Sequence, residues 1–279
     1  MPFGFDAYGI SDIGLSRPNN EDVWIALPEI GFFALADGMG GHLAGEIAAK
    51  EAIESLAASV ATIPRTTPQE IAQNLRKAIE KANAWVLSMG RLHPPYSGMG
   101  TTLCCLYWTE DRVIYAHVGD SRIYRYRRQK LELLTEDHSL FAKWLATGKL
   151  AEECQTPYPY KNVITRAVGT GEKVNPEIVI ARHEPDDLYF LCSDGLSDVL
   201  SLIEIEKILQ NALDLESAAF LLIEKAKIKG SSDNMTILMI QKEGKDGEDL
   251  PRQQLYDRAR PESLESHASG SLRPSREPL

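Results

Sequence analysis

Five aspartates lie at the ends of segments that have the character of buried strands, far apart in the sequence. They are Asp22, Asp37, Asp120, Asp194 and Asp233. Each one alone fits an ordinary turn or cap, because aspartate is a preferred turn former. Strand ends at one edge of a sheet sandwich can converge, and converged carboxylates repel one another strongly where the dielectric constant is low. Bound cations or raised pKa values must then offset that repulsion.

The ligand atoms that these five aspartates offer are all oxygens, because no cysteine or histidine stands at metal-ligand spacing in the sequence. Oxygen ligands favour Mg²⁺ or Mn²⁺ over Zn²⁺. Asp37 is followed by Gly38 and two further glycines, which let the backbone turn sharply and approach a ligand. Two such ions about 3.5–4 Å apart can activate water and hold a phosphoryl group. The aspartates therefore suggest hydrolysis of a phosphate ester.

The elements that must position these aspartates follow the order strands, two helices, many strands, two helices and a last strand. Alternation and apolar runs predict strands over residues 3–10, 22–27, 31–36, 101–109, 112–118, 121–127, 130–134, 177–183, 188–192 and 235–241. This order differs from the regular strand–helix alternation of a doubly wound parallel sheet. It favours an α+β fold, a four-layer α-β-β-α sandwich of two antiparallel sheets flanked by helix pairs.

Two pairs of amphipathic helices are expected on the outer faces of the sheets. An apolar stripe at helical spacing from Ala49 to Val60 marks the first helix. Thr67, with Glu70 three positions later, predicts a capping box at the start of the second. The remaining expected elements are helices over 202–213 and 215–227, a short helix over 139–147 and an irregular surface flap over about 139–160.

The bulk composition is that of a soluble globular protein with room for a core: 279 residues, 43% hydrophobic and 25% charged. The formal charge of −10 argues against a nucleic-acid binder that works by phosphate neutralisation. No apolar stretch reaches membrane-spanning length, and the first residues do not form a signal peptide. We therefore expect a cytoplasmic protein without a membrane anchor. Its cysteines are expected to be free thiols, with Cys104, Cys105 and Cys192 in apolar runs.

The character of the chain changes after residue 242. Residues 243–279 contain four prolines, many charged residues and few large apolar side chains. Such a segment cannot bury enough apolar surface to fold alone. We predict one folded domain over 1–242 and a disordered polar tail over 243–279.

Seven short motifs occur in an order that identifies a family. They are Arg-Pro-Asn-Asn-Glu-Asp at 17–22, Asp-Gly-Met-Gly-Gly-His at 37–42, Gly-Thr-Thr at 100–102, Gly-Asp-Ser-Arg at 119–122, Thr-Glu-Asp-His-Ser at 135–139, Ser-Asp-Gly at 193–195 and Asp-Asn at 233–234. Each motif alone is weakly specific, but the ordered set resembles the bacterial metal-dependent type 2C protein phosphatases, the PPM family. The resemblance covers roughly residues 5–241, and the fold of that family is the α-β-β-α sandwich.

The resemblance implies a role for each metal-site position. Asp37 is similar to the aspartate that bridges two Mn²⁺ or Mg²⁺ ions, and the Gly38 carbonyl to a ligand of the second ion. Asp194 and Asp233 resemble ligands of the first ion, and Asp22 a residue that holds metal-bound water. Asp120 resembles the residue that, with Asp194, holds a third ion in bacterial members.

The resemblance also implies which residues would contact phosphate. Arg17 matches the phosphate-binding arginine, whose planar guanidinium suits a phosphoryl group. Many eukaryotic members carry a histidine, the proposed general acid, where Met39 stands here. The histidine of this chain, His42, follows the glycines and is either the general acid or a helix cap. His117 and His138 are expected to be structural.

The function that the resemblance implies is hydrolysis of phosphoserine and phosphothreonine in proteins by a metal-activated water, opposing a serine/threonine kinase. We expect a monomer with phosphorylated proteins as substrates and no role for nucleic acid or membrane. One alternative is a partner-switching regulatory phosphatase for a single small phosphoprotein. Another is a non-catalytic phospho-binding pseudophosphatase, although every metal-site aspartate is present. The negative charge opposes a third, a nucleic-acid phosphodiesterase.

Overall fold

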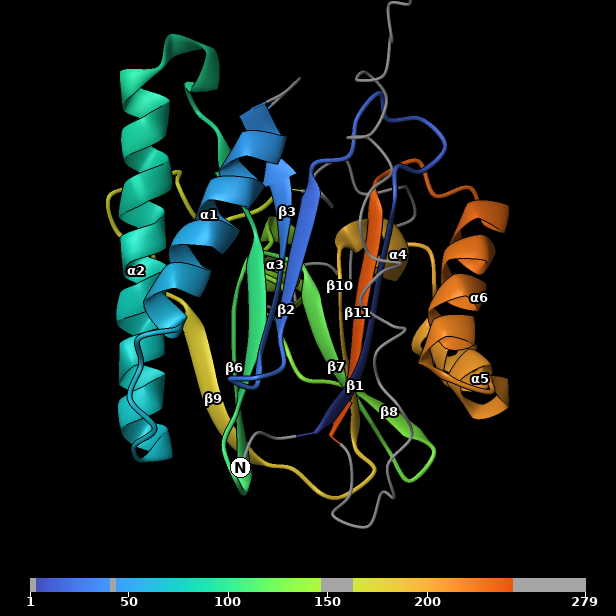
Figure 1. Ribbon diagram of the computed structural model, residues 1–279. Helices are drawn as coiled ribbons and strands as arrows, with labels where there is room; N and C mark the ends of the chain where they lie inside the picture. The colour runs from blue at the N-terminus through green and yellow to red at the C-terminus, as the bar shows by residue number, and fades with distance from the viewer. Residues whose placement is uncertain (1–3, 41–43, 147–162, 243–279) are drawn as a thin grey trace, which may run out of the picture. The chain divides into compact units, whose positions relative to one another are not determined.

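Two antiparallel sheets stack face to face in the part of the chain that the computed structural model describes, residues 4–40, 44–146 and 163–242 (Figure 1). All of these residues belong to one compact unit, Met1–Gly244. The first sheet has the strand order β1 Phe5–Asp12, β11 Met235–Lys242, β10 Leu188–Cys192, β7 Arg122–Arg127 and β8 Lys130–Leu133. The chain therefore brings its first and last described strands together as neighbours.

The second sheet takes its strands mainly from the first half of the chain. Its order is β2 Asp22–Leu27, β3 Phe32–Met39, β5 Leu103–Trp108, β6 Arg112–Val118 and β9 Glu177–Arg182, and the short β4 Gly100–Thr101 pairs with β3. Every pairing in both sheets is antiparallel. Short turns join β5 to β6 and β7 to β8 as hairpins. The short link at Gly119 and Asp120 also predicted a hairpin between β6 and β7, and this prediction is wrong, because the chain crosses there from one sheet to the other.

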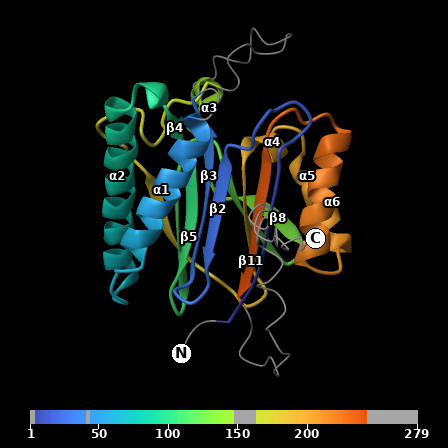
Figure 2. The same cartoon turned by 45° about the horizontal axis from the view of Figure 1, so that its top comes forward.

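Helices cover the outer face of each sheet (Figure 2). The helices α1 Ala44–Val60 and α2 Pro68–Leu92 lie on the second sheet, while α5 Leu202–Asn211 and α6 Leu215–Ile228 lie on the first. Three short helices complete the described elements: the 3₁₀ helix Pro94–Tyr96, α3 Leu140–Ala146 and α4 Asp194–Ser197. The four-layer α-β-β-α sandwich predicted from the sequence is confirmed.

Apolar side chains fill the three spaces between these four layers. The space between the sheets holds Phe33, Trp108 and Tyr189, whose rings meet edge to face with centroids 5.5 and 5.3 Å apart. Such contacts add about 0.5–1.5 kcal/mol per pair to the gain from burial. Separate apolar clusters join α1 and α2 to one sheet and α4, α5 and α6 to the other. The two sheets are thus packed together by apolar side chains along the length of their strands.

The helix starts show why these segments are helical. Thr67 accepts a hydrogen bond from the Glu70 N–H while the Glu70 carboxylate accepts one from the Thr67 N–H, so the predicted capping box is confirmed. Ser201 with Glu204 forms a second capping box at the start of α5. A favourable cap stabilises a helix by about 1 kcal/mol.

The end of β3 differs from the sequence-based expectation. The predicted strand stopped at residue 36 and placed Asp37 in a turn, whereas β3 continues to Met39. The extension forms because Gly38 and Met39 pair with Thr101 and Gly100 of β4. For the same reason the predicted strand over 101–109 divides into β4 and β5, with Thr102 between them.

Several expectations fall partly or wholly outside the described residues. They are the general-acid candidate His42, most of the flap at 139–160 and the tail at 243–279. Within the described residues, the predicted short helix is α3, and Cys104, Cys105 and Cys192 are buried free thiols as expected. A search of the same residues finds no helix long and apolar enough to cross a membrane.

Candidate metal centre

The paired strands β2 and β3 place two aspartates directly opposite each other. Asp22, the first residue of β2, pairs with Asp37 near the end of β3. Like charges opposite each other in a sheet are destabilising. Asp22 is only 8% exposed, and its Oδ1 atom has no hydrogen-bond partner within the described part of the chain. This strand pair therefore ends in two carboxylates that need a counterion.

The other sheet supplies two more carboxylates at the same edge. Asp194 is the first residue of α4, which follows β10, and Asp233 lies just before β11. Ser193 directly precedes Asp194 in the chain. Its hydroxyl donates to Oδ2 of Asp22 at 2.7 Å and accepts from the Thr236 N–H at 2.9 Å. Ser193 is fully buried. It joins the two sheets directly beneath the aspartates.

The electrostatics show that the aspartates converge. Loss of solvent raises the pKa of Asp37, and the nearby charges of Asp22, Asp194, Asp120 and Asp233 raise it further. The pKa of Asp194 is raised by burial, then by Asp120 and Asp233 among other carboxylates. Carboxylates that raise one another's pKa lie close together. All five aspartates singled out in the sequence are therefore brought to one region.

The motif Gly-Thr-Thr at 100–102 fixes the backbone of Asp37. The Asp37 N–H donates to Oγ1 of Thr102 at 2.9 Å, and the Asp37 carbonyl accepts from the Thr101 hydroxyl at 2.9 Å and from the Thr102 N–H at 2.8 Å. The Thr102 hydroxyl also bonds to the Ser121 hydroxyl at 2.7 Å. Asp37 is thus held by three hydrogen bonds from two buried threonines, a role that the sequence did not reveal.

Gly38 lies where only a glycine fits. A Cβ atom at this position would stand 2.1 Å from the carbonyl oxygen of Gly45 and 2.8 Å from that of Glu21. The Gly38 N–H donates to the Glu21 carbonyl at 3.1 Å. The strand and the start of α1 therefore approach each other closely, and the backbone next to Asp37 is held between them.

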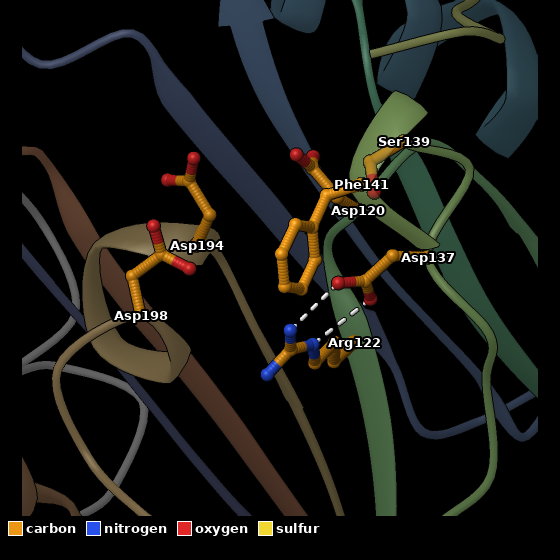
Figure 3. A pocket seen from close by; sticks show the side chains of 7 residues that line it. All are labelled: Asp120, Arg122, Asp137, Ser139, Phe141, Asp194 and Asp198. Carbon is orange, nitrogen blue, oxygen red and sulfur yellow. Dashed lines mark hydrogen bonds and ion pairs between the residues drawn. The ribbon is translucent and has the colours of Figure 1, made fainter. Parts of the chain in front are cut away.

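A pocket lies between the turn after β6 and helix α4 (Figure 3). Asp194 of α4 and Asp198, the residue directly after α4, form one side, and Asp120 stands opposite. Asp120 is 8% exposed, its Oδ1 atom has no partner among the described residues, and burial and the charge of Asp137 raise its pKa to about 6. Asp198 is not among the aspartates singled out in the sequence, although its spacing of four from Asp194 places both on one face of a helical turn.

The floor of this pocket is a charged pair. Arg122 donates from Nε and Nη2 to the two carboxylate oxygens of Asp137 at 2.9 and 2.6 Å, and from Nη1 to the Ser197 carbonyl at 3.3 Å. Arg122 follows Asp120 by two residues, and Asp137 lies in the motif at 135–139. The fork of this arginine therefore joins the turn, α4 and the start of the flap.

Arg17 reaches the same edge from the loop between β1 and β2. Its Nη2 atom donates to Oδ2 of Asp233 at 2.6 Å, and its side chain is 51% exposed. The position fits a group that can contact both the aspartates and a bound phosphate. Of the candidates named from the sequence, His42 alone lies outside the described residues.

The residues present fit hard divalent cations. The converging groups are carboxylates from both sheets, and two buried carboxylate oxygens, one on Asp22 and one on Asp120, have no partner in the described residues. Five negative charges at close range are tolerated only when protons or cations neutralise them. Mg²⁺ and Mn²⁺ take such oxygen ligands.

Comparison with known families shows to which family a chain with this site belongs. A family model described as protein phosphatase 2C matches residues 19–224. The chain belongs to the protein phosphatase 2C family. Membership in the protein phosphatase 2C family confirms the resemblance drawn from the seven motifs.

Individual relatives agree with the assignment. The serine/threonine phosphatase Stp of Listeria monocytogenes is 35% identical over 237 residues, which are 84% of this chain and 94% of the relative. The crystal structure of the Mycobacterium tuberculosis serine/threonine phosphatase PstP is 34% identical, has a TM-score of 0.79, and is matched over 86% of this chain and 99% of that chain. A PstP catalytic domain in complex with two manganese ions is 32% identical, with a TM-score of 0.76 and coverage of 86% and 99%.

Two histidines of this protein phosphatase 2C chain lie beside the site without being part of it. His117 and His138 are buried and stacked, with ring centroids 4.4 Å apart. With Glu177 they form a His-His-Glu group. Nε2 of His117 donates to the Glu136 carbonyl at 2.9 Å, and the Arg166 guanidinium lies 3.1 Å from Nε2 of His138. Because a positive charge already stands there, the group does not suit a cation, and the structural role of both histidines stays a prediction.

Proposed function

We propose that this chain hydrolyses phosphoserine and phosphothreonine in proteins at a centre of two Mn²⁺ or Mg²⁺ ions. Asp37 would bridge the ions, Asp194 and Asp233 would hold the first, and the Gly38 carbonyl would hold the second. Asp22 would bind water at the centre. The observation that carries the proposal is the convergence of carboxylates from both sheets, with buried oxygens that lack a partner among the described residues.

The chemistry divides between the ions and the chain. When bound, the ions supply an activated water and neutralise charge on the phosphoryl group. Arg17 binds phosphoryl oxygens through its forked guanidinium and so orients phosphorus toward the centre. Thr101, Thr102 and Ser193 hold the carboxylates in place through the hydrogen bonds described above.

A cysteine-dependent route does not fit the described residues. Cys104, Cys105 and Cys192 are fully buried, and burial raises the pKa of Cys105 and of Cys192 to about 12. A thiol acts as a nucleophile only as the thiolate, which these environments disfavour at neutral pH. The reaction therefore proceeds without a covalent phosphocysteine on these residues.

A third ion is part of the proposal. Asp120 and Asp194 would hold it in the pocket of Figure 3, and Asp198 extends the carboxylate set there. Such an ion would have few protein ligands and would keep several waters, as Mg²⁺ commonly does. It would bind more weakly than the two ions at Asp37.

The partners follow from the activity. The chain acts on phosphorylated proteins, and we infer that it opposes a serine/threonine kinase in the cytoplasm and works as a monomer. Of the alternatives, a pseudophosphatase is not favoured, because the metal-site aspartates are all present and converge. A regulatory phosphatase with one dedicated substrate shares the same site, and rates on several phosphoproteins would separate it from a phosphatase of broad range.

Removal of metal gives the direct test of the function. A phosphothreonine peptide should be hydrolysed in Mn²⁺ or Mg²⁺ and left intact in excess EDTA, because the carboxylates alone neither activate water nor neutralise phosphate. Phosphate release is the measurement, and readdition of Mn²⁺ is the control for reversibility. Full activity in EDTA would contradict the proposed mechanism.

The role of His42 needs a separate comparison. If His42 donates a proton to the leaving alkoxide, His42→Ala should slow a phosphothreonine peptide on the order of 10²-fold or more. The same variant should leave p-nitrophenyl phosphate almost unaffected, because its leaving group needs no proton. Equal rates of loss on both substrates, or no loss, would assign His42 to the helix cap instead.

A further inference from the structure

The turn that carries Asp120 has an unusual backbone. Gly119 has a φ of +106°, a conformation that favours glycine, and a Cβ atom there would stand 2.7 Å from the side chain of Thr102. Asp120 follows directly, with its Oδ1 atom buried and without a partner in the described part of the chain. The direction of this carboxylate therefore depends on how the turn is held.

One residue binds both polar backbone groups of Gly119. The His138 N–H donates to the Gly119 carbonyl at 2.9 Å, and the Gly119 N–H donates to Nδ1 of the His138 ring at 3.1 Å. His138 is 7% exposed, so water does not compete strongly for these bonds. On the other side of Asp120, the Ser121 hydroxyl bonds to Thr102. The turn is thus held by hydrogen bonds on both sides of Asp120, and His138 supplies those on the Gly119 side.

The surroundings of His138 fix its ring. Burial, and then the charges of His117 and Arg166, lower its pKa to about 3, so the ring is neutral at physiological pH. A main-chain N–H can only donate, so the Gly119 contact requires Nδ1 as the acceptor and puts the proton of the neutral ring on Nε2, on the side of the Glu177 carboxylate. The Arg166 guanidinium, which can also only donate, then makes no hydrogen bond to the ring. Nε2 faces Oε2 of Glu177 at 3.6 Å and Nη1 of Arg166 at 3.1 Å. The His138 carbonyl accepts from the N–H and hydroxyl of Thr165 at 2.7 and 3.0 Å.

We propose that His138 is a positioning residue for Asp120, whose carboxylate it directs into the pocket by holding Gly119 through Nδ1 and the main chain. Its role in the reaction is to set the affinity of the third ion without contacting substrate or metal. The proposal rests on the proposed function, in which Asp120 holds that ion. Groups that orient a metal ligand commonly change metal affinity by 10–100-fold when they are removed.

A pair of substitutions at His138 distinguishes the role of Nδ1 from that of Nε2. In His138→Asn, the amide oxygen can take the place of Nδ1 and accept from the Gly119 N–H. In His138→Gln, the longer side chain places its amide near Nε2, toward Glu177 and Arg166, and leaves the Gly119 N–H without that acceptor. Both variants remove the ring that stacks on His117, so loss of stacking affects them equally.

Two readouts on the full-length chain apply to each variant. Calorimetric titration with MnCl₂ counts the bound ions and their affinities, and the rate on p-nitrophenyl phosphate is measured against Mn²⁺ concentration. We expect His138→Gln to lower the affinity of the most weakly bound ion by about 10-fold or more. The Mn²⁺ concentration that gives half the maximal rate should rise by the same factor. His138→Asn should stay within about threefold of wild type, since the acceptor is kept.

Two further variants serve as references. His117→Gln removes the other ring of the stack but keeps a donor for the Glu136 carbonyl, so its titration should match wild type. Asp120→Ala should lose the weakest ion and keep the two tighter ones. Thermal unfolding in EDTA checks that all variants are folded.

Each contrary outcome has a distinct meaning. If Asp120→Ala loses an ion while His138→Gln and His138→Asn behave alike, His138 does not position Asp120 through Nδ1, and the inference is overturned. A stronger loss in His138→Asn than in His138→Gln overturns it as well. If Asp120→Ala keeps every ion, the third-ion assignment fails and the inference fails with it, while the two-ion centre at Asp37 is unaffected.

Discussion

Asp37→Asn should reduce phosphate release from a phosphothreonine peptide by about 10³-fold or more. Asp37 is the residue whose charge meets all the other carboxylates of the site, and in the proposed centre it bridges both ions. Loss of a bridging carboxylate removes several kcal/mol of metal-dependent stabilisation, and each 1.36 kcal/mol corresponds to a factor of ten in rate. Turnover at saturating Mn²⁺ is the measurement.

The stability of this variant shows that the loss is not a folding defect. The folded-state pKa of Asp37 is raised above its unfolded value, so the metal-free protein loses stability as the pH rises above the unfolded-state pKa of this carboxyl towards the folded-state one. In EDTA at about pH 7.5, Asp37→Asn should therefore unfold at a higher temperature than wild type. The matched control is Asp111→Asn, because the Asp111 side chain is 70% exposed in the turn between β5 and β6. Near wild-type turnover in Asp37→Asn would remove Asp37 from the bridging position.

Arg17→Ala should raise KM for phosphorylated peptides and weaken inhibition by inorganic phosphate. A hydrogen bond to a charged group contributes about 1.5–3 kcal/mol, which corresponds to a change of about 10- to 150-fold. Arg17→Lys should recover only part of the loss, because an ammonium cannot form the forked contact. Steady-state kinetics with and without phosphate provide the measurement.

The geometry of Arg17 also defines the control for this prediction. Arg17 is half-exposed and bonds to Asp233 at the site, whereas Arg91 is 62% exposed and pairs with Glu172 outside it. Arg91→Ala removes the same charge from the surface and should leave KM unchanged. If Arg17→Ala has the KM and phosphate affinity of wild type, Arg17 is an ordinary loop residue.

The sequence allowed most of the fold to be predicted because its elements carry local signals. The capping box at Thr67 and Glu70 lies within four residues, and both the pattern and the structure agree. The antiparallel hairpins follow from short turns such as the one between β5 and β6. The end of β3 was predicted wrongly because Gly38 and Met39 have little strand propensity of their own, and they are extended only through pairing with β4.

The site was predictable to the extent that its residues are charged. Aspartates at strand ends stand out, and all five converge as expected. The supporting hydroxyls do not stand out, because serine and threonine are common and their roles at Thr102 and Ser193 depend on contacts 65 and 171 residues apart. Asp198 was overlooked because the four-residue helix α4 is too short to show a periodic pattern.

The position of β11 has a consequence for the synthesis of the protein. β11 is the last described strand to leave the ribosome, yet it lies inside its sheet between β1 and β10. Until residue 242 has emerged, β1 and β10 lack their shared neighbour, and Asp233 is not fixed beside the other aspartates. A growing chain, or one ended early by a nonsense codon, therefore cannot complete the centre. Activity therefore appears only after residue 242 has emerged, and termination before that residue yields no partly active phosphatase.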